Sequence, residues 1–352
     1  MALPDNIVET IIVCPRTPSQ WYFMSLISVS VFGVYSSNTN KQINYVYSKR
    51  TAGKGSNEVV SMLHHFARNT RLYCVSTWTI YADNCVGLNK NNTVLTFLLF
   101  LVHSKWLKQA KLKFFIKGHT KNNCDRGFGN IRRKYARVNV WTLDELAALI
   151  DESAETNECE QIENWSHFKN FTDAFARMYK DFVGITKYHI FEMDSEKPGV
   201  VVYKNLPGST PREMNLLLPN TKTTLSEEDV TNVWQSFTPS KRKQPNPEKI
   251  CHRYKNLRKF LPKEHLDDPL YKPPSNSDIE RAQKVKKARS ELRATLAANA
   301  EADITTEQAT GTTTEQANER ITERMSSPVD DEHEDNSDSD DQSMILTEEK
   351  TN

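Results

Sequence analysis

Alternating apolar and polar positions in the first third of the chain predict a mixed α/β domain. Residues 21–35 alternate and are rich in β-branched and aromatic types, and the run at 42–48 repeats this pattern after a turn-like segment. The two runs therefore predict a β-hairpin. Apolar residues at helical spacing then follow Ser56, a suitable N-cap with Glu58 in the first turn. The next predicted elements are a strand at 75–83, a buried helix from Asn92, a strand at 111–118 and a basic helix at 124–138.

The second half of the chain predicts shorter elements and then a tail. Thr142 and Glu145 have the spacing of a capping box, residues 185–204 resemble a small hairpin, and Ser226 is placed to cap a short helix. Further helices are predicted around 171–182, near 248–261 and near 277–298. From Ala300 the composition changes to Thr, Glu, Gln, Ser and Asp, which cannot bury a core and predicts a disordered tail.

The amino-acid composition limits the classes of protein to which this chain can belong. At 352 residues with 38% hydrophobic residues, the chain is long enough for two domains and can bury at least one core. No window approaches the roughly 18 apolar residues of a membrane span, and residues 1–16 lack the pattern of a secretory signal. The six cysteines include no Cys-x-x-Cys pair, which argues against disulfides and a zinc ribbon. We expect a soluble intracellular protein with reduced thiols, no membrane partner and no small-molecule cofactor.

The net charge of +1 hides two regions of opposite sign. Residues 300–352 hold 16 acids and 3 bases, a net charge of −13, so the other 299 residues carry +14. A basic body suggests a polyanion as partner, and the tail would compete for the same surface. The alternative is that the tail only solvates the chain.

Two carboxylates are the candidate chemistry. Asp83 closes the strand at 75–83, and Asp125 lies in the first turn of the helix after the next strand. Neighbouring strands joined by a helix usually lie side by side, so both side chains can reach one end of the sheet. Oxygen ligands of this kind suit Mg²⁺ or Mn²⁺ in a phosphoryl-transfer site. In the alternative interpretation Asp83 is a turn former and Asp125 a partner of the helix dipole.

The charge around Asp125 favours a phosphate ligand. Between residues 105 and 137 there are eleven bases and a single acid, Asp125 itself. A site that holds phosphate needs such a cationic surrounding. The candidate contacts to the phosphate backbone of DNA are Lys121, Arg126, Arg132, Arg133, Lys134 and Arg137.

Three strings carry a resemblance to a known family: GKGSNEVVSMLHH at 53–65, YADNCVGLNKNN at 81–92 and FFIKGHTKNNCDRGFGNIRRKY at 114–135. They are similar to a eukaryotic family of mobile-element proteins known mainly as a domain of unknown function, frequent in oomycetes and plants. Its members are regarded as DDE-type transposases with an RNase H-like fold. The resemblance covers roughly residues 20–148 strongly and 254–271 more faintly.

The resemblance implies roles for individual residues. Asp83 would be the second acid of a catalytic triad and Asp125 the third, with Asn84 supporting Asp83 and with His119 and Thr120 positioning the end of the last strand. Related sequences usually have Gln where this chain has Leu88. The first acid of the family lies on an opening strand before a Leu-Pro pair, which here is already at positions 3 and 4. We therefore expect that strand and its acid to be missing, which would leave an open site and an unpaired central edge.

The sequence leads to three hypotheses of function. The first is a degenerate DDE-type transposase-like protein, ancestrally a metal-dependent enzyme of DNA strand cleavage and transfer and inactive as given. The others are a non-catalytic nucleic-acid-binding remnant and an interaction protein that acts through its acidic tail. Basic clusters at 241–243 and 284–289 suggest the nucleus. The predicted organisation is an RNase H-like mixed α/β core at 1–140 without its first strand, an α+β extension at 141–238, a basic linker with helices at 239–299 and a disordered acidic tail at 300–352.

Overall fold

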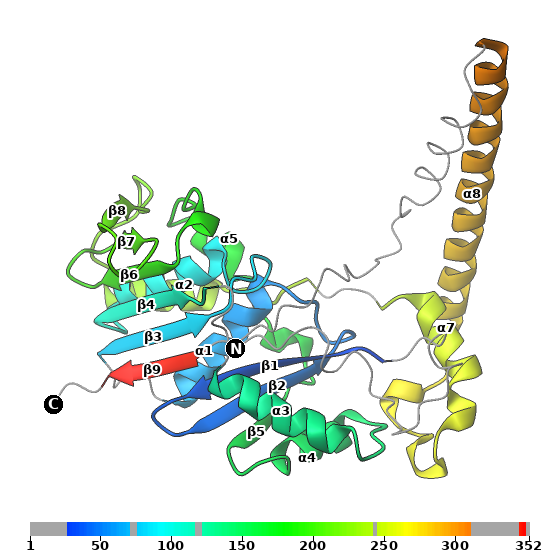
Figure 1. Cartoon of the computed structure of the whole chain (residues 1–352), viewed down its shortest axis with the longest axis horizontal. Coiled ribbons are helices and arrows are strands. Elements are labelled where there is room, and N and C mark those ends of the chain that lie inside the picture. The colour runs from blue at the N-terminus through cyan, green and yellow to red at the C-terminus, as the bar shows by residue number, and fades with distance from the viewer. Residues whose placement is uncertain (1–26, 71–75, 117–121, 242–244, 311–344, 350–352) are drawn as a thin grey trace. The chain divides into compact units, whose positions relative to one another are not determined.

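The computed structural model of the chain describes residues 27–70, 76–116, 122–241, 245–310 and 345–349 (Figure 1). Contacts divide the chain into two compact units. Unit 1 comprises residues 1–244 and 340–352, and unit 2 comprises residues 245–339. The segments that the sequence suggested at 1–140 and 141–238 thus share one unit.

The predicted hairpin opens unit 1. Strand β1 (Val29–Ser36) pairs antiparallel with β2 (Lys41–Ser48), from Val29 opposite Ser48 to Ser36 opposite Lys41. Asn40 has a φ of 52° in the turn, a left-handed conformation that asparagine tolerates better than most residues. The prediction of a hairpin at this place is confirmed.

The middle of unit 1 alternates helices with strands as the sequence predicted. Helix α1 (Ser56–Asn69), strand β3 (Thr77–Ala82), helix α2 (Asn92–His103) and strand β4 (Gln109–Phe114) follow in order. Every residue of α2 from Thr93 to His103 is buried, which fits its apolar sequence. One detail was wrong: the N-cap of α1 is Gly55, and the Ser56 hydroxyl instead donates to Thr93 Oγ1 at 3.2 Å.

Helices α3 (Asn123–Tyr135) and α4 (Leu143–Asp151) lie on the face of the sheet opposite to α1 and α2. The predicted capping box of Thr142 and Glu145 begins α4. Helix α3 approaches the strands closely at two glycines: a Cβ on Gly33 would lie 2.3 Å from the ring of Phe128, and a Cβ on Gly127 would lie 2.1 Å from Gln42 Oε1. Strand β5 (Asn157–Gln161) then pairs parallel with β2.

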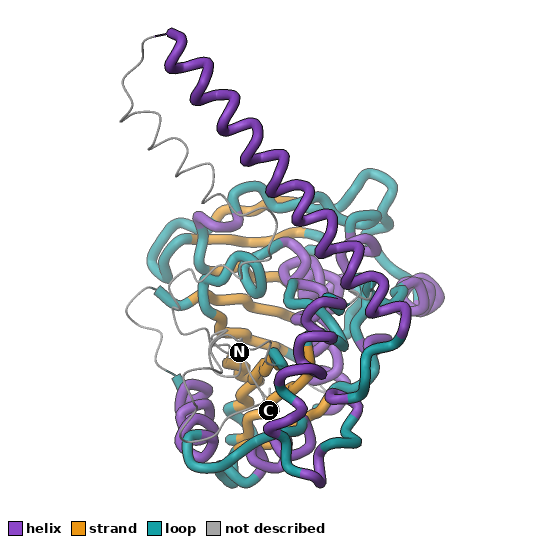
Figure 2. The backbone as a smooth tube through the Cα atoms, turned by 90° about the vertical axis from the view of Figure 1, so that its right-hand side faces the viewer, coloured by secondary structure: helices purple, strands orange, loops and turns teal. Residues whose placement is uncertain are grey.

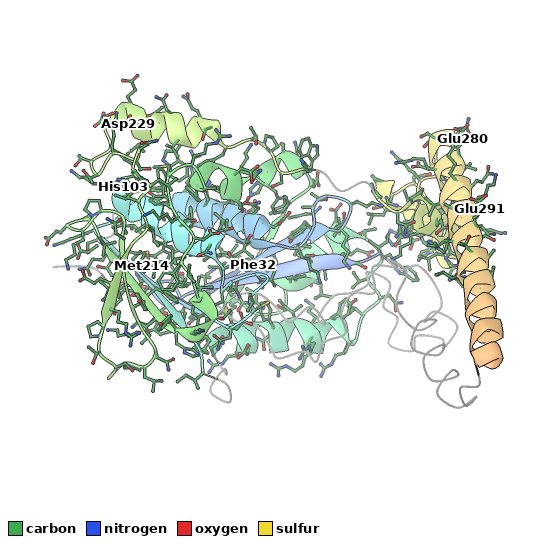
Figure 3. The ribbon with its side chains drawn as sticks, turned by 90° about the horizontal axis from the view of Figure 1, so that it is seen from above. Phe32, His103, Met214, Asp229, Glu280 and Glu291 are labelled. Carbon is green, nitrogen blue, oxygen red and sulfur yellow. The ribbon has the colours of Figure 1, made fainter. Side chains whose placement is uncertain are left out.

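The rest of unit 1 extends the sheet and covers α2. Helix α5 (Phe171–Phe175) is much shorter than the helix predicted over 171–182. The predicted second hairpin is formed by β6 (Ile190–Asp194) and β7 (Val200–Lys204), to which β8 (Arg212–Asn215) adds. Helix α6 (Glu227–Ser236) begins with a capping box of Ser226 and Asp229 (Figure 3). Short 3₁₀ helices lie at Trp165–His167 and Ile185–Lys187.

The strands form one mixed sheet in the order β5-β2-β1-β9-β3-β4-β6-β7-β8 (Figure 2), with β9 (Ile345–Glu349) in a central position. β9 runs antiparallel to β3, with Ile345 opposite Tyr81, and parallel to β1, with Ile345 opposite Tyr35. The sequence predicted an unpaired edge at this place, and that prediction is wrong. Exposed strand edges readily accept another extended segment because their backbone groups need hydrogen-bond partners.

Helices cover the two faces of this sheet unevenly. α1, α2 and α5 lie on one face, where Trp78 of β3 stacks on Phe66 of α1 with ring centroids 6.5 Å apart. α3 and α4 lie on the opposite face, across β1, β2 and β5, and Figure 1 shows no helix in front of β3 and β4 there. The part of this second face formed by β3 and β4 therefore carries half-buried side chains such as Tyr81 and Lys113.

Unit 2 is helical. It contains α7 (Pro247–Asn256), the long α8 (Asn276–Thr310) and 3₁₀ helices at Arg258–Phe260, Lys263–His265 and Pro269–Tyr271. Both predicted helices are present, but α8 continues ten residues beyond Ala300, where the sequence predicted disorder. Alanine and glutamate in 301–310 are good helix formers, which explains the extension. Residues 311–344 and 350–352 of the predicted tail lie outside the described residues. Among the described helices, none is both long and apolar enough to span a membrane.

Candidate functional site

Asp83 lies one residue beyond the end of β3 and is 5% exposed. Its Oδ1 accepts a hydrogen bond from Asn89 Nδ2 at 2.5 Å and a longer one from the backbone N–H of Cys85 at 3.4 Å. Asn89 is fully buried, and its own Oδ1 has no hydrogen-bond partner. A buried carboxylate with a charge-assisted hydrogen bond is expensive to build, so this end of β3 is the first candidate for a functional site.

The loop after Asp83 folds back on the ends of β3 and β4. The backbone N–H groups of Asn89 and Lys90 each donate to the Cys85 carbonyl at 2.9 Å. Lys90 Nζ donates to Asn84 Oδ1 at 2.8 Å, and Asn84 Nδ2 donates to the Phe115 carbonyl at 2.5 Å. The loop thereby joins the segment that carries Asp83 to the segment that follows β4.

Lys90 is a buried cation in this loop. It is 2% exposed, and its Nζ lies 5.0 Å from the centroid of the Phe114 ring, a distance at which a cation is attracted by the aromatic face. Burial lowers the pKa of Lys90 to about 8. The ammonium group therefore remains charged at neutral pH while it depends on Asn84 and Phe114 for stabilisation.

Asp125 lies in the first turn of α3, as predicted, and it has a structural role there. Its Oδ2 accepts a hydrogen bond from the Asn122 backbone N–H at 2.8 Å, while the Asn122 side chain accepts from the N–H groups of Cys124 and Asp125. This reciprocal arrangement is a capping box that stabilises the start of the helix. One carboxylate oxygen of Asp125 is thus already engaged by the backbone.

The described residues do not fit the two-metal centre that the resemblance implies. Such a centre needs several oxygen ligands around two cations. Across the described ranges, no group of three or more His, Cys, Asp and Glu side chains lies close enough to hold a metal ion. Asp83 accepts a hydrogen bond from Asn89 through Oδ1, and Asp125 accepts one at the cap of α3 through Oδ2. We therefore assign no metal-dependent step to these residues.

The predicted basic residues of α3 divide into exposed and paired groups. Arg126, Arg132, Arg133 and Arg137 are exposed. Lys134 is half-buried, and its Nζ lies 2.5 Å from Glu152 Oε2 at the end of α4. Arg133 also donates to the Gly129 carbonyl at 3.3 Å. Arg126, Arg132 and Arg133 share the helix whose first turn holds Asp125, and Arg137 follows two residues after its end. This segment therefore presents a cationic surface to solvent.

Three predicted site residues lie outside the described residues: His119, Thr120 and Lys121. Leu88 is half-buried in the loop, and its backbone N–H donates to the Cys85 carbonyl at 3.4 Å.

A family model of a domain of unknown function, DUF7869, matches residues 22–209. This match covers more than half of the 352 residues. The chain belongs to the DUF7869 family. The family region contains the whole Asp83 loop, α3 and the sheet from β1 to β7. Neither the curated proteins nor the solved structures contain a match to the chain.

The sequence reasoning missed three residues that organise the site of this DUF7869 member. Asn89, Lys90 and Phe115 fix the Asp83 segment through hydrogen bonds of their side chains or backbone. Both Asn89 and Lys90 belong to the string that carried the resemblance, and they lie in a polar run just before the apolar helix α2. Polar residues just before a buried helix are typical of a packed loop, which is a signal that could have found them.

Proposed function

We propose that this DUF7869 protein binds nucleic acid through its phosphates and is a descendant of DDE-type transposases that does not cleave DNA. The fold supports descent: a hairpin is followed by two parallel strands joined by a buried helix, with a basic helix on the opposite face. That order is typical of an RNase H-like core. The mixed α/β fold of the chain is observed directly and does not depend on this proposal.

The exposed arginines of α3 carry the proposal. Arg126 and Arg133 lie on α3 and Arg137 lies two residues after its end, in a body whose first 299 residues have a net charge of +14. Cations grouped in this way neutralise phosphates and release counterions, which gives strong and sequence-independent binding at low salt. The helix dipole adds to this only at the N-terminal end, near Asp125.

The donor set of the site supports the absence of cleavage. Transfer of a phosphoryl group by two metal ions requires carboxylates that are available to the cations. Among the described residues, no group of three or more His, Cys, Asp and Glu side chains is close enough to hold such cations.

The test of binding is a titration of labelled duplex DNA with the full chain at several salt concentrations. We expect the affinity to fall steeply with salt, and the triple variant Arg126→Gln, Arg133→Gln, Arg137→Gln to lose up to about 2.7 from the slope of log K against log salt, at about 0.9 for each phosphate contact. The matched control replaces three exposed cations elsewhere in unit 1, Arg177, Lys180 and Lys187. Equal losses in both triple variants, or no binding at low salt, would refute the proposal.

The test of cleavage uses the same protein with supercoiled DNA and Mg²⁺ or Mn²⁺. We expect no nicking above that of the Asp83→Ala variant, together with unchanged DNA affinity in that variant. Metal-dependent cleavage that disappears in Asp83→Ala would show that the protein is an active nuclease or transposase.

We also propose that the protein acts in the nucleus. Lys284, Lys286 and Lys287 are exposed on α8 of unit 2, and short exposed runs of cations are what nuclear import receptors bind. Replacing these three lysines by glutamine should move a fluorescent fusion of the full chain out of the nucleus. An unchanged distribution would refute this location signal.

A further inference from the structure

We propose that Tyr81 and Phe115 form a stacking surface for a base of single-stranded nucleic acid, beside Asp83 and on the part of the sheet that none of the described helices covers. This inference rests on the proposed function and adds to it a second kind of contact. The exposed arginines of α3 would hold phosphates, whereas the two rings would hold a base.

Both rings occupy the same end and the same face of the sheet. Tyr81 lies near the end of β3, and Phe115 is the first residue after β4. The strands are parallel, with Tyr81 opposite Lys113, so residues 81, 113 and 115 share a face. The ring centroids of Tyr81 and Phe115 lie 6.1 Å apart with an angle of 25° between the planes.

The backbone holds Phe115 against the segment that contains Asp83. The Phe115 N–H donates to the Ala82 carbonyl at 2.9 Å, and the Phe115 carbonyl accepts from Asn84 Nδ2 at 2.5 Å. These two bonds flank Asp83 on either side in the sequence. A base stacked on the rings would therefore lie close to the Asp83 segment.

The surroundings of the rings are open and partly apolar. Tyr81 and Phe115 are both half-buried, Ile116 is 46% exposed, and Val86 in the neighbouring loop is 54% exposed. A pair of rings across two strands contributes about 0.2–1 kcal/mol to a sheet without any ligand. That contribution accounts for the pair itself, but it does not account for the accessibility of both rings at the end of the sheet that carries a buried carboxylate.

Lys113 supplies the charge that a nucleotide needs. Its Nζ lies 5.1 Å from the centroid of the Tyr81 ring and 3.3 Å from the Tyr81 hydroxyl. An ammonium group beside an aromatic ring can contact the phosphate of a nucleotide whose base stacks on the ring. On the same face, Lys111 lies opposite Glu192 and Lys204 pairs with Glu192 at 3.4 Å. Among the described residues, Lys113 is therefore the cation beside the two rings.

The geometry points to single strands because the bases of a duplex are already stacked on each other. Only an unpaired base exposes its face to a protein ring. Such stacking is tolerant of sequence because each base has an aromatic face.

The experiment compares the full chain with the variant Tyr81→Leu, Phe115→Leu on labelled oligo(dT), oligo(rU) and duplex DNA. We expect the affinity for single strands to fall about 5- to 150-fold for one lost base stack, with an unchanged dependence on salt and an unchanged affinity for duplex DNA. Lys113→Gln should instead lower the salt slope by about 0.7. The matched control is Tyr254→Leu, because Tyr254 is 37% exposed with Arg258 5.3 Å from its ring centroid.

Each outcome decides between the proposals. If the wild-type chain binds duplex DNA and the double variant keeps its affinity for single strands, the stacking surface is refuted and the proposed function stands. If the wild-type chain binds no nucleic acid at low salt, both are refuted. Oligo(dT) and oligo(rU) show whether the strand is DNA or RNA.

A second measurement covers the case in which the double variant fails to fold. Wild-type protein is irradiated with oligonucleotides that contain 5-iodouracil, and the adducts are located by mass spectrometry. Adducts on Tyr81 or Phe115 are expected. Adducts confined to other residues would refute the proposal.

Discussion

The bond between Asn89 and Asp83 should have a measurable share in the stability of unit 1. Asn89→Ala removes the donor that lies 2.5 Å from a carboxylate only 5% exposed. A hydrogen bond to a charged group contributes about 1.5–3 kcal/mol, and a buried charge that loses a donor costs more. The same substitution removes the buried Asn89 Oδ1, which lacks a partner, and so offsets part of this loss. We expect the free energy of unfolding to decrease by about 2 kcal/mol.

The partner variant separates charge from packing. Asp83→Asn keeps the shape of the side chain and removes its charge, so the loss of the Asn89 donor matters less in the double variant Asp83→Asn, Asn89→Ala. We expect the double variant to lose about 1–2 kcal/mol less than the sum of the single variants. If Asp83→Asn alone matches or exceeds the stability of the wild type, the carboxylate costs stability, as expected of a group retained for function.

Urea unfolding followed by tryptophan fluorescence reports on this part of the chain alone. All six tryptophans belong to unit 1, because the last of them is Trp234 and unit 2 begins at residue 245. Asn139→Ala is the control, since Asn139 is an exposed asparagine of the same unit. A change below about 0.5 kcal/mol in Asn89→Ala, or strict additivity in the double variant, would refute the reasoning.

Three further predictions follow from the packing and the charge of the chain. Burial lowers the pKa of His64 to about 4, so the unfolded chain binds the proton first as the pH falls. The free energy of unfolding should therefore decrease between about pH 6.5 and pH 4. In acid titrations, His64→Phe should reduce this decrease by at most about 3 kcal/mol, and an unchanged pH profile would contradict the prediction. Gly127→Ala should lower stability in urea by about 1–3 kcal/mol because its Cβ would lie 2.1 Å from Gln42 Oε1, whereas Gly129→Ala, with open space around it, should not destabilise. Deleting residues 300–352 removes a charge of −13 and should tighten DNA binding in low-salt titrations; equal affinities would show that the tail does not compete.

The local patterns of the sequence predicted most elements of unit 1. The hairpin of β1 and β2 follows from alternation, and the buried helix α2 follows from its apolar run. The capping boxes at Thr142 and Ser226 have their signal within four residues. Such features depend on neighbours in the sequence, which is why a single chain is enough to find them.

The features that were missed depend on distant partners. The predicted helix over 171–182 ends at Phe175 because the Lys180 N–H donates to the Leu216 carbonyl at 2.7 Å and the Leu218 N–H donates to the Met178 carbonyl at 3.0 Å. These strand-like bonds replace helical ones although the apolar spacing suits a helix. The insertion of β9 between β1 and β3 likewise joins residues that are far apart in the chain.

The candidate site likewise contains features that local sequence patterns predicted and features that depend on distant partners. Asp83 and Asp125 were placed correctly at a strand end and in a first helical turn, but their partners were not predicted. Asn89 reaches Asp83 through the folded loop, while Lys90 and the Phe115 carbonyl just after the neighbouring strand bind Asn84. Whether these acids ever act together in catalysis stays a prediction.

The loop between β3 and α2 has a consequence for how this family can vary in length. Three consecutive residues have three different attachments: Asn89 holds Asp83, Lys90 holds Asn84, and Asn91 caps α2 by accepting from the Val94 N–H. Loops normally tolerate insertions and deletions. Here, adding or removing one residue between Asn84 and Asn89 would disturb the two attachments that span this segment, Asn89 to Asp83 and Lys90 to Asn84, whereas the local cap of α2 by Asn91 would be kept. Members of the family that keep this arrangement should therefore keep the number of residues between the Asp-Asn pair and the Asn-Lys-Asn run, even where the side chains between them change.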